Sequence, residues 1–362
     1  MTDLTRSVTG GVDTHKDFHV AVALDDVGRL LGTEQFPATM QGYRALLGWL
    51  REMGTVAAVG VEGTGSFGAG LTRFLTSKKI SVVEVDRPNR QRRHRHGKSD
   101  PADAESAARA VLAEDATAVP KAADGPVEAI RLLRVARRTA IKARSQAANQ
   151  LQSVIDNSPE VLRAQFRGLT EGKRIAKAAG LRHRGVVTPL GAAKLTLSTL
   201  AKRWLALTGE IAMLDSHVAE LVALVAPSTL GVKGVGKETL SALLVATGDN
   251  PERLRSERSF AALCGVCPVD ASSGRHQRHR LSRGGNRDAN RALHLIVLNR
   301  LTWDPRTQEY LERRVADGKS KKEAIRCLKR YVARELYHHI CSDLRPLSSN
   351  YSGLEQECPR AA

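Results

Sequence analysis

The order of apolar patterns in the first 115 residues constrains the fold more than any other feature of the sequence. Alternating or continuous apolar runs indicate strands, and apolar residues at 3–4 spacing indicate helices. The patterns are strand, strand, strand, helix, strand, helix and strand, over residues 7–13, 18–24, 29–36, 40–53, 56–61, 67–77 and 80–85. A three-stranded hairpin followed by α-β-α-β is therefore predicted, an order typical of an α/β RNase H-like fold, and residues 1–115 are predicted to form that domain.

A second region, residues 126–226, is predicted to be a helical insertion or a coiled-coil dimerisation arm that holds protomers together. Apolar residues keep strict 3–4 spacing for four heptads from Leu197 to Val225. An upstream series from Ile130 to Val154 keeps the same spacing but has Arg137 and Arg144 at two of its positions.

Residues 228–347 are predicted to form a mostly helical third domain, and residues 348–362 a frayed tail. A near match to a phosphate-binding loop occurs in this domain at Gly231–Glu238, where Glu238 replaces the required Ser or Thr. We favour a helix-hairpin-helix-like turn there, with a plain interhelical turn as the alternative.

The charge balance points to a polyanionic partner. The chain of 362 residues carries 56 Lys plus Arg against 38 Asp plus Glu, a formal net charge of +18. No apolar run approaches the length of a membrane span, and no signal pattern occurs at the N-terminus. Five cysteines without a regular framework fit a reducing compartment. A cytoplasmic protein that contacts no membrane is expected.

Four carboxylates are candidates for a metal site. Asp13 and Glu62 end two strands that are neighbours in an RNase H-like sheet, and Asp100 and Asp103 share one face of a helix start. Such a quartet would repel itself without a cation, and its hard oxygen ligands suit Mg²⁺ or Mn²⁺. The alternative for Asp100 and Asp103 is a helix cap, with Asp100 as the N-cap.

Two other motifs in the sequence would indicate different functions. Gly63–Gly68 matches G-x-G-x-x-G with Asp86 at the end of the next strand, a pattern of NAD-dependent oxidoreductases. The preceding hairpin argues against it. Cys264 and Cys267 with His276 and His279 are spaced too irregularly for common zinc fingers.

Small hydroxyl residues lie among arginines between residues 271 and 291. A phosphate could be held there while a serine oxygen attacks it. The alternative is a basic DNA-contacting loop without covalent chemistry.

The chain resembles the IS110 family of insertion-sequence transposases, which are related to the Piv/MooV DNA invertases. The motifs that carry the resemblance are Gly11-Val-Asp13-Thr-His-Lys, Val61-Glu62-Gly-Thr-Gly, Lys98-Ser-Asp100-Pro-Ala-Asp103-Ala and Ser273-Gly…Leu281-Ser-Arg-Gly-Gly-Asn286…Arg291. Two departures are Asn290, where an apolar residue is usual, and the Ser272-Ser273 pair, which leaves the nucleophile ambiguous by one position.

The resemblance implies a RuvC-like N-terminal domain whose metal ligands are Asp13, Glu62, Asp100 and Asp103, and a C-terminal transposase domain with Ser273 as nucleophile and Ser272 as the alternative. It also implies a nucleoid-associated, prokaryotic recombinase guided by a bridge RNA, working as dimers that pair into tetramers. A RuvC-like nuclease or junction resolvase without serine chemistry is the main alternative.

Nucleic-acid contacts are expected from two groups of residues. The cationic run at 87–98 and the arm supply one group, namely Arg87, Arg90, Arg92, Arg93, Arg95, Lys98, Arg137 and Arg144. The third domain supplies the other, namely Lys233, Lys237, Arg275, Arg278, Arg280, Arg283, Asn286 and Arg291. Binding through such contacts weakens steeply with salt.

Overall fold

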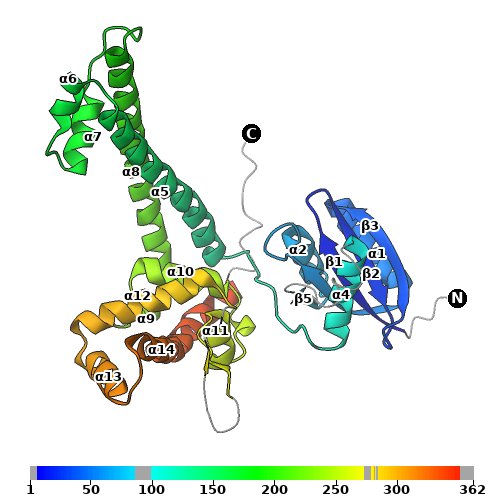
Figure 1. Cartoon of the computed structure of the whole chain (residues 1–362). Coiled ribbons are helices and arrows are strands. Elements are labelled where there is room, and N and C mark those ends of the chain that lie inside the picture. The colour runs from blue at the N-terminus through cyan, green and yellow to red at the C-terminus, as the bar shows by residue number, and fades with distance from the viewer. Residues whose placement is uncertain (1–5, 86–98, 273–278, 281, 283, 351–362) are drawn as a thin grey trace. The chain divides into compact units, whose positions relative to one another are not determined.

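The computed structural model describes residues 6–85, 99–272, 279–280, 282 and 284–350. The chain divides into two compact units (Figure 1). Unit 1 comprises Met1–Ala123 together with Asn250–Arg255, and unit 2 comprises Asp124–Asp249 together with Ser256–Ala362. Each unit is considered separately below.

A five-stranded mixed sheet forms the centre of unit 1. Its strands are β1 (Ser7–Thr14), β2 (Phe18–Leu24), β3 (Leu30–Pro37), β4 (Thr55–Glu62) and β5 (Val82–Val85), in the order β3-β2-β1-β4-β5. β2 is antiparallel to β1 and β3, whereas β4 is parallel to β1 and β5. This mixed α/β arrangement is compatible with an RNase H-like domain. A doubly wound dinucleotide-binding sheet would be parallel where β1, β2 and β3 are antiparallel.

Helices cover both faces of the sheet, because side chains along a strand alternate between its faces. α1 (Met40–Glu52) and α2 (Ala69–Ser77) bury Leu46, Leu50 and Leu71 on the face that presents Val12 of β1. α4 (Asp100–Leu112) packs on the opposite face, against Val20, Val22 and Leu24 of β2.

Two glycines bring α4 unusually close to the sheet. A Cβ atom on Gly11 would lie 2.1 Å from the carbonyl oxygen of Ala104 and 2.4 Å from the backbone nitrogen of Ala108. A Cβ atom on Gly60 would lie 2.7 Å from a methyl group of Val111. The missing side chains therefore let α4 rest directly on β1 and β4, which fixes where the first turn of α4 lies.

The segment Asn250–Arg255 belongs to unit 1 and secures the stretch that was expected to be a linker at 114–125. Asn250 accepts a hydrogen bond from the backbone of Ala122 at 3.0 Å and donates one to the carbonyl of Pro120 at 3.1 Å. Arg253 donates to the carbonyl of Val119 at 2.8 Å and to the carboxylate of Glu84 at 2.9 Å. This linker is thus tied to β5 by side chains from far along the chain.

Unit 2 is helical apart from one short hairpin in its described residues. α5 (Pro126–Asp156) and α8 (Pro189–Val225) pack along each other, as Figure 1 shows. α6 (Glu160–Arg163), the 3₁₀ turn η1 (Ala164–Phe166) and α7 (Glu171–Ala179) lie between them in sequence and share a core with them. Much of the apolar seam of α8, including Ile211, Leu214 and Val218, is buried. Because α5 of the same chain packs against α8, a partner protomer is not needed to explain that burial.

The remaining elements of unit 2 follow α8 in the chain. They are α9 (Pro227–Leu230), α10 (Lys237–Thr247), α11 (Glu257–Leu263), β6 (Val269–Asp270), β7 (His279–Arg280), α12 (Arg287–Trp303), α13 (Pro305–Ala316) and α14 (Lys321–Asn350). α10, α13 and α14 each contact α12, and α11 contacts α14. Among the described helices, none combines the length and apolar character that crossing a membrane requires.

Candidate metal centre and nucleic-acid surface

The carboxyl ends of β1 and β4 bring Asp13 and Glu62 to one edge of the sheet. The two strands are parallel, and Val12 pairs with Val61 in their register, so Asp13 and Glu62 follow at the next position. The hydroxyl of Thr14 donates to the backbone carbonyl of Glu62 at 2.8 Å. The sequence prediction that these residues emerge at a common edge matches this register.

The first turn of α4 carries Asp100 and Asp103 to the same edge. Ser99 is the N-cap residue and makes no side-chain capping hydrogen bond, while Pro101 follows the first helical residue, Asp100. The helix-capping alternative placed Asp100 at the N-cap, one residue later than the cap in the structure. Asp103 is buried, with 4% of its surface exposed, which is unusual for an aspartate.

His15 joins two of these carboxylates and was not among the residues predicted from the sequence. Its Nε2 atom lies 3.3 Å from Oδ2 of Asp13 and 3.3 Å from Oδ2 of Asp100. One potential ligand atom from each of the three residues lies within 4.8 Å of the others. The sequence did contain one signal for His15. It lies two residues after Asp13, and side chains two residues apart point to the same side of an extended chain.

Burial and neighbouring charges shift the pKa of Asp13 in this centre. Burial raises the pKa of Asp13, the proximity of His15 opposes that rise, and the negative charges of Asp100 and Asp103 add to it. Asp103 therefore contributes to the field at Asp13. Glu62 is at the adjoining strand end but is not one of the three residues whose ligand atoms cluster among the described residues.

A divalent cation fits this centre on two observations. The Nε2 atom of His15 lies 3.3 Å from a carboxylate oxygen of both Asp13 and Asp100, so three potential ligand atoms face one another. The ionised form of Asp13 is disfavoured by burial and by neighbouring negative charge, which a bound cation would offset. Two carboxylates and an imidazole are ligands for divalent ions, but they do not fix which ion binds.

The serine region is described in part. Ser272 lies two residues after β6, and both its backbone N–H and its hydroxyl donate to the Asp270 carboxylate. These hydrogen bonds lower the pKa of Asp270. Arg280 lies exposed in β7. Ser273, Arg275, Arg278 and Arg283 are outside the described residues.

Several residues predicted to contact nucleic acid have partners within the chain. Arg137 forms ion pairs with Asp215 and, at 3.2 Å, with Glu238. The guanidinium of Arg144 lies 5.6 Å from the ring centre of Trp204, a cation–π contact. Both arginines thus hold α5 to other helices of unit 2, whatever else they bind.

Asn286 also has a structural role, because it is the N-cap of α12 and accepts a hydrogen bond from the backbone of Ala289 at 3.0 Å. Lys233, Lys237 and Arg291 are exposed. The predicted contacts in the cationic run lie outside the described residues; they are Arg87, Arg90, Arg92, Arg93, Arg95 and Lys98.

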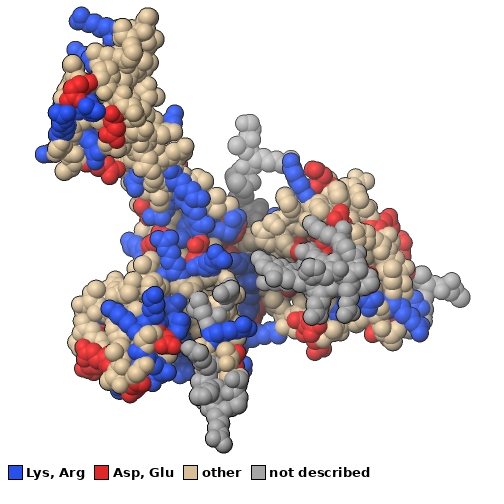
Figure 2. All heavy atoms as spheres, viewed as in Figure 1, with Lys and Arg blue, Asp and Glu red and all other residues tan. Residues whose placement is uncertain are grey.

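A basic surface follows α5 where it approaches α10. Figure 2 shows Lys and Arg side chains gathered there, and a cavity of about 520 Å³ at this place is lined by five of them. They are Arg134, Arg137, Arg138, Lys142 and Arg291. Asp288 pairs with Arg138, and Glu238 pairs with Arg134 and Arg137, which leaves an excess of positive charge on this surface.

Comparisons with known proteins identify relatives of both units. A family model described as a transposase of the IS110 type, with a name that refers to a DEDD motif, matches residues 10–158. A second, described as the IS116/IS110/IS902 transposase family, matches residues 230–312. Together they cover more than half of the chain.

Two curated proteins of Streptomyces coelicolor are similar to part of the chain. One is an uncharacterized 43.6 kDa protein of insertion element IS110, 30% identical over 192 residues. The other is a candidate transposase for the IS117 mini-circle, 32% identical over 204 residues. Each alignment covers 52% of this chain, and 43% and 47% of the respective relative, so the chain matches less than half the length of either. The ordered motifs and both family matches show that the chain belongs to the IS110 family of insertion-sequence transposases.

Proposed function

We propose that the protein is a DNA transposase that cleaves and rejoins DNA strands through a serine nucleophile, with Mg²⁺ or Mn²⁺ held by its acidic centre. The observation that carries this proposal is the convergence of Asp13, His15 and Asp100 at one sheet edge, in a chain of this family. Glu62 and Asp103 complete the proposed ligand environment from the adjoining strand and from the same helix turn.

Several residues of unit 1 would contribute to binding the ion. Asp13 and Asp100 offer carboxylate oxygens, and His15 offers Nε2. Asp103 is buried and adds negative charge that favours a cation. Divalent ions in such sites activate an oxygen nucleophile and stabilise the leaving oxygen of a phosphodiester.

In the serine step, the hydroxyl oxygen of Ser273 attacks the phosphorus of the scissile phosphodiester. A serine–phosphate bond forms as the bond to the departing strand's oxygen breaks, and the serine proton passes to a nearby base. Rejoining is the reverse attack by the end of a second strand, which releases the serine. Ser272 is the alternative nucleophile, and its hydroxyl already donates to the ionised Asp270.

The partners of this reaction are proposed on the same basis. The net charge of +18 supports binding of DNA and of a guide RNA. Assembly of homodimers into tetramers would let the serine of one protomer meet the acidic centre of another.

Covalent trapping tests the proposal. The protein is incubated with Mg²⁺ or Mn²⁺ and a nicked DNA substrate bearing the ends of the element, and protein–DNA adducts are resolved on denaturing gels. An adduct is expected in the wild type, but not in Ser273→Ala or in Asp13→Asn. Ser153→Ala, which changes an exposed serine on α5, is the matched control and should leave the adduct intact.

The outcomes separate the candidate functions. Cleavage without an adduct, surviving the loss of both Ser272 and Ser273, would replace the transposase with a RuvC-like nuclease or junction resolvase. An adduct that persists in Asp13→Asn would show that the acidic centre does not serve the serine.

A further inference from the structure

A second polar cavity lies in unit 2, away from the acidic centre in sequence and on other elements. Its volume is about 620 Å³, and its walls come from the segment after α11, from β7, from the turn after α13 and from α14. Six of its lining side chains are cations; they are Arg280, Lys319, Arg326, Lys329, Arg330 and Arg334. We call it the cationic cavity.

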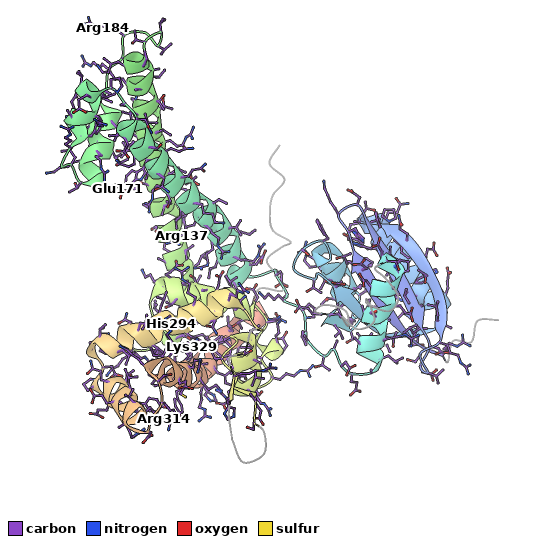
Figure 3. The ribbon with its side chains drawn as sticks, in the orientation of Figure 1. Arg137, Glu171, Arg184, His294, Arg314 and Lys329 are labelled. Atoms are coloured by element: carbon purple, nitrogen blue, oxygen red, sulfur yellow. The ribbon has the colours of Figure 1, made fainter. Side chains whose placement is uncertain are left out.

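Lys329 is the buried cation of this cavity, with 7% of its surface exposed. Lys329 belongs to α14, and its side chain lies between α14 and α12 (Figure 3). Its Nζ atom donates at 2.9 Å to Oδ1 of Asn290, which is a neutral amide. Burial lowers the pKa of Lys329, and the charge of Arg326 lowers it further. A buried ammonium whose hydrogen-bond partner is uncharged is costly to fold.

Asn290 is held so that its oxygen faces Lys329. Its Nδ2 atom donates to the backbone carbonyls of Cys264 at 2.9 Å and Gly265 at 3.0 Å. An apolar side chain at this position could make none of these three hydrogen bonds. Asn290 therefore connects the cavity wall at Gly265 to the buried Lys329.

The neighbouring acids do not balance the cations. Glu257 is shared between Arg330, at 3.0 Å, and Arg334, at 2.9 Å. The Nη1 atom of Arg330 is buried and has no hydrogen-bond partner among the described residues.

The lining contains two acids, and only Glu323 lies near one of the six cations. Asp317 pairs with Arg314 at 3.3 Å, and Glu323 accepts hydrogen bonds from Ser320 and lies 3.6 Å from Arg326. Positive charge and hydrogen-bond donors are thus in surplus within the cavity.

An anion with several acceptor oxygens is the ligand that such a site would take. A lysine ammonium and an arginine fork together match the oxygens of a phosphate group. The volume is in the range of sites that hold whole small molecules, so a phosphate could enter with its attached sugar. The side chain of Arg334 is 56% exposed and Arg280 is exposed, so a charged strand could continue outward from the cavity.

We propose that the cationic cavity binds a backbone phosphodiester of a nucleic-acid strand, with Lys329 and Arg330 as its principal donors. Its wall includes β7 and Pro268, which precedes β6, and the segment joining β6 to β7 contains Ser272 and Ser273. The site would therefore hold a strand against β7, which follows the proposed nucleophile in the sequence. The inference rests on the proposed function for its ligand class.

The test is a binding titration in EDTA, which needs neither the metal nor the serine. Fluorescence anisotropy is measured for the full chain with a labelled single-stranded DNA and an RNA of the same sequence, over a series of salt concentrations. Lys329→Met removes the buried charge and is expected to fold, because it replaces a costly buried ammonium with an apolar chain of similar length. Lys322→Met removes the same charge from an exposed position on the same helix.

Lys329→Met should raise the Kd about tenfold. It should also reduce the slope of log affinity against log salt concentration by the amount expected for about one phosphate contact. Lys322→Met should change the affinity by less than about twofold. Equal losses of affinity for DNA and RNA would mean that the site binds the phosphates common to both. A loss of affinity for only one of them would identify that nucleic acid as the ligand. Wild-type affinity in Lys329→Met, or a loss no larger than in Lys322→Met, would overturn the inference. Because cleavage is not measured, failure of the serine mechanism would leave this result intact.

Discussion

Replacing Gly11 by alanine should move the acidic residues at the start of α4 away from Asp13 at the end of β1. The new Cβ atom would lie 2.1 Å and 2.4 Å from two backbone atoms of α4, whereas ordinary contact begins near 3.4 Å. Because backbone atoms cannot rotate aside as a side chain can, α4 must move by about 1 Å. That movement carries Asp100 and Asp103 away from Asp13 on β1.

The expected costs follow from that displacement. Overpacking of a well-packed contact destabilises a protein by about 1–3 kcal/mol, which corresponds to a fall of several degrees in the Tm. Mg²⁺ demands ligand distances near 2.0–2.1 Å, so a shift of this size should weaken metal binding at least about tenfold and strand cleavage by about a hundredfold. The assays are thermal denaturation in EDTA, Mn²⁺ titration by calorimetry, and covalent trapping on a nicked DNA.

Gly48→Ala is the matched control. Gly48 is exposed in α1, and a Cβ atom there would meet nothing within 4 Å. Alanine should stabilise that helix by about 0.5–1 kcal/mol and leave metal binding unchanged. If Gly11→Ala kept the wild-type Tm, the close packing of α4 would be refuted. If it lost stability but kept its metal affinity, the argument that this packing positions the ligands would be refuted.

Four further substitutions or modifications test other parts of the structure. Asp13→Asn should raise the Tm of the metal-free protein, because burial raises the pKa of Asp13. Below the unfolded pKa of 3.8, Asp13 is protonated in both the folded and the unfolded protein, and its stability contribution is complete. As the pH rises through the folded pKa, Asp13 becomes charged and that contribution is lost. The denaturation curves of the wild type and of Asp13→Asn in EDTA should therefore converge at low pH. Burial raises the pKa of the Cys264 thiol to about 12, so native protein should protect Cys264 from alkylation that labels it after unfolding, as peptide mapping would show. Arg144→Ala should cost about 0.5–1 kcal/mol through the lost contact with Trp204, whereas Lys233→Ala, at an exposed position, should weaken nucleic-acid binding without changing the Tm.

The sheet and the strand-end positions of Asp13 and Glu62 were predictable because they follow from local alternation and from the order of the elements. The roles of the arm arginines were not predictable in the same way. Arg137 and Arg144 occupy seam positions of α5, and the sequence of α5 alone cannot say what faces them. Their partners, Asp215 and Trp204, come from α8, whose pairing with α5 depends on tertiary packing. Their expected nucleic-acid contacts stay a prediction.

His15 and Asn286 illustrate two different reasons for the remaining gaps. His15 acquires its significance only when α4 brings Asp100 within 3.3 Å, a contact between residues far apart in the chain. Asn286 stands directly before a helix, where asparagine is a preferred N-cap, so its capping role carried a local signal. That signal was outweighed by the arginines around it, which favour a nucleic-acid contact.

Asp13 and Lys329 share one energetic property, although they belong to different units and carry opposite charges. Burial disfavours the charged form of each, and like charges nearby add to that cost: Asp100 and Asp103 for Asp13, and Arg326 for Lys329. A ligand of opposite charge removes the cost only in the folded protein, so its binding free energy adds to stability, by about 2.7 kcal/mol at a hundred times its Kd. Divalent cations should therefore raise the Tm of the wild type but not of Asp13→Asn, and an oligonucleotide should raise it less in Lys329→Met. If both ligands raised the Tm equally in both variants, neither buried charge would belong to a binding site.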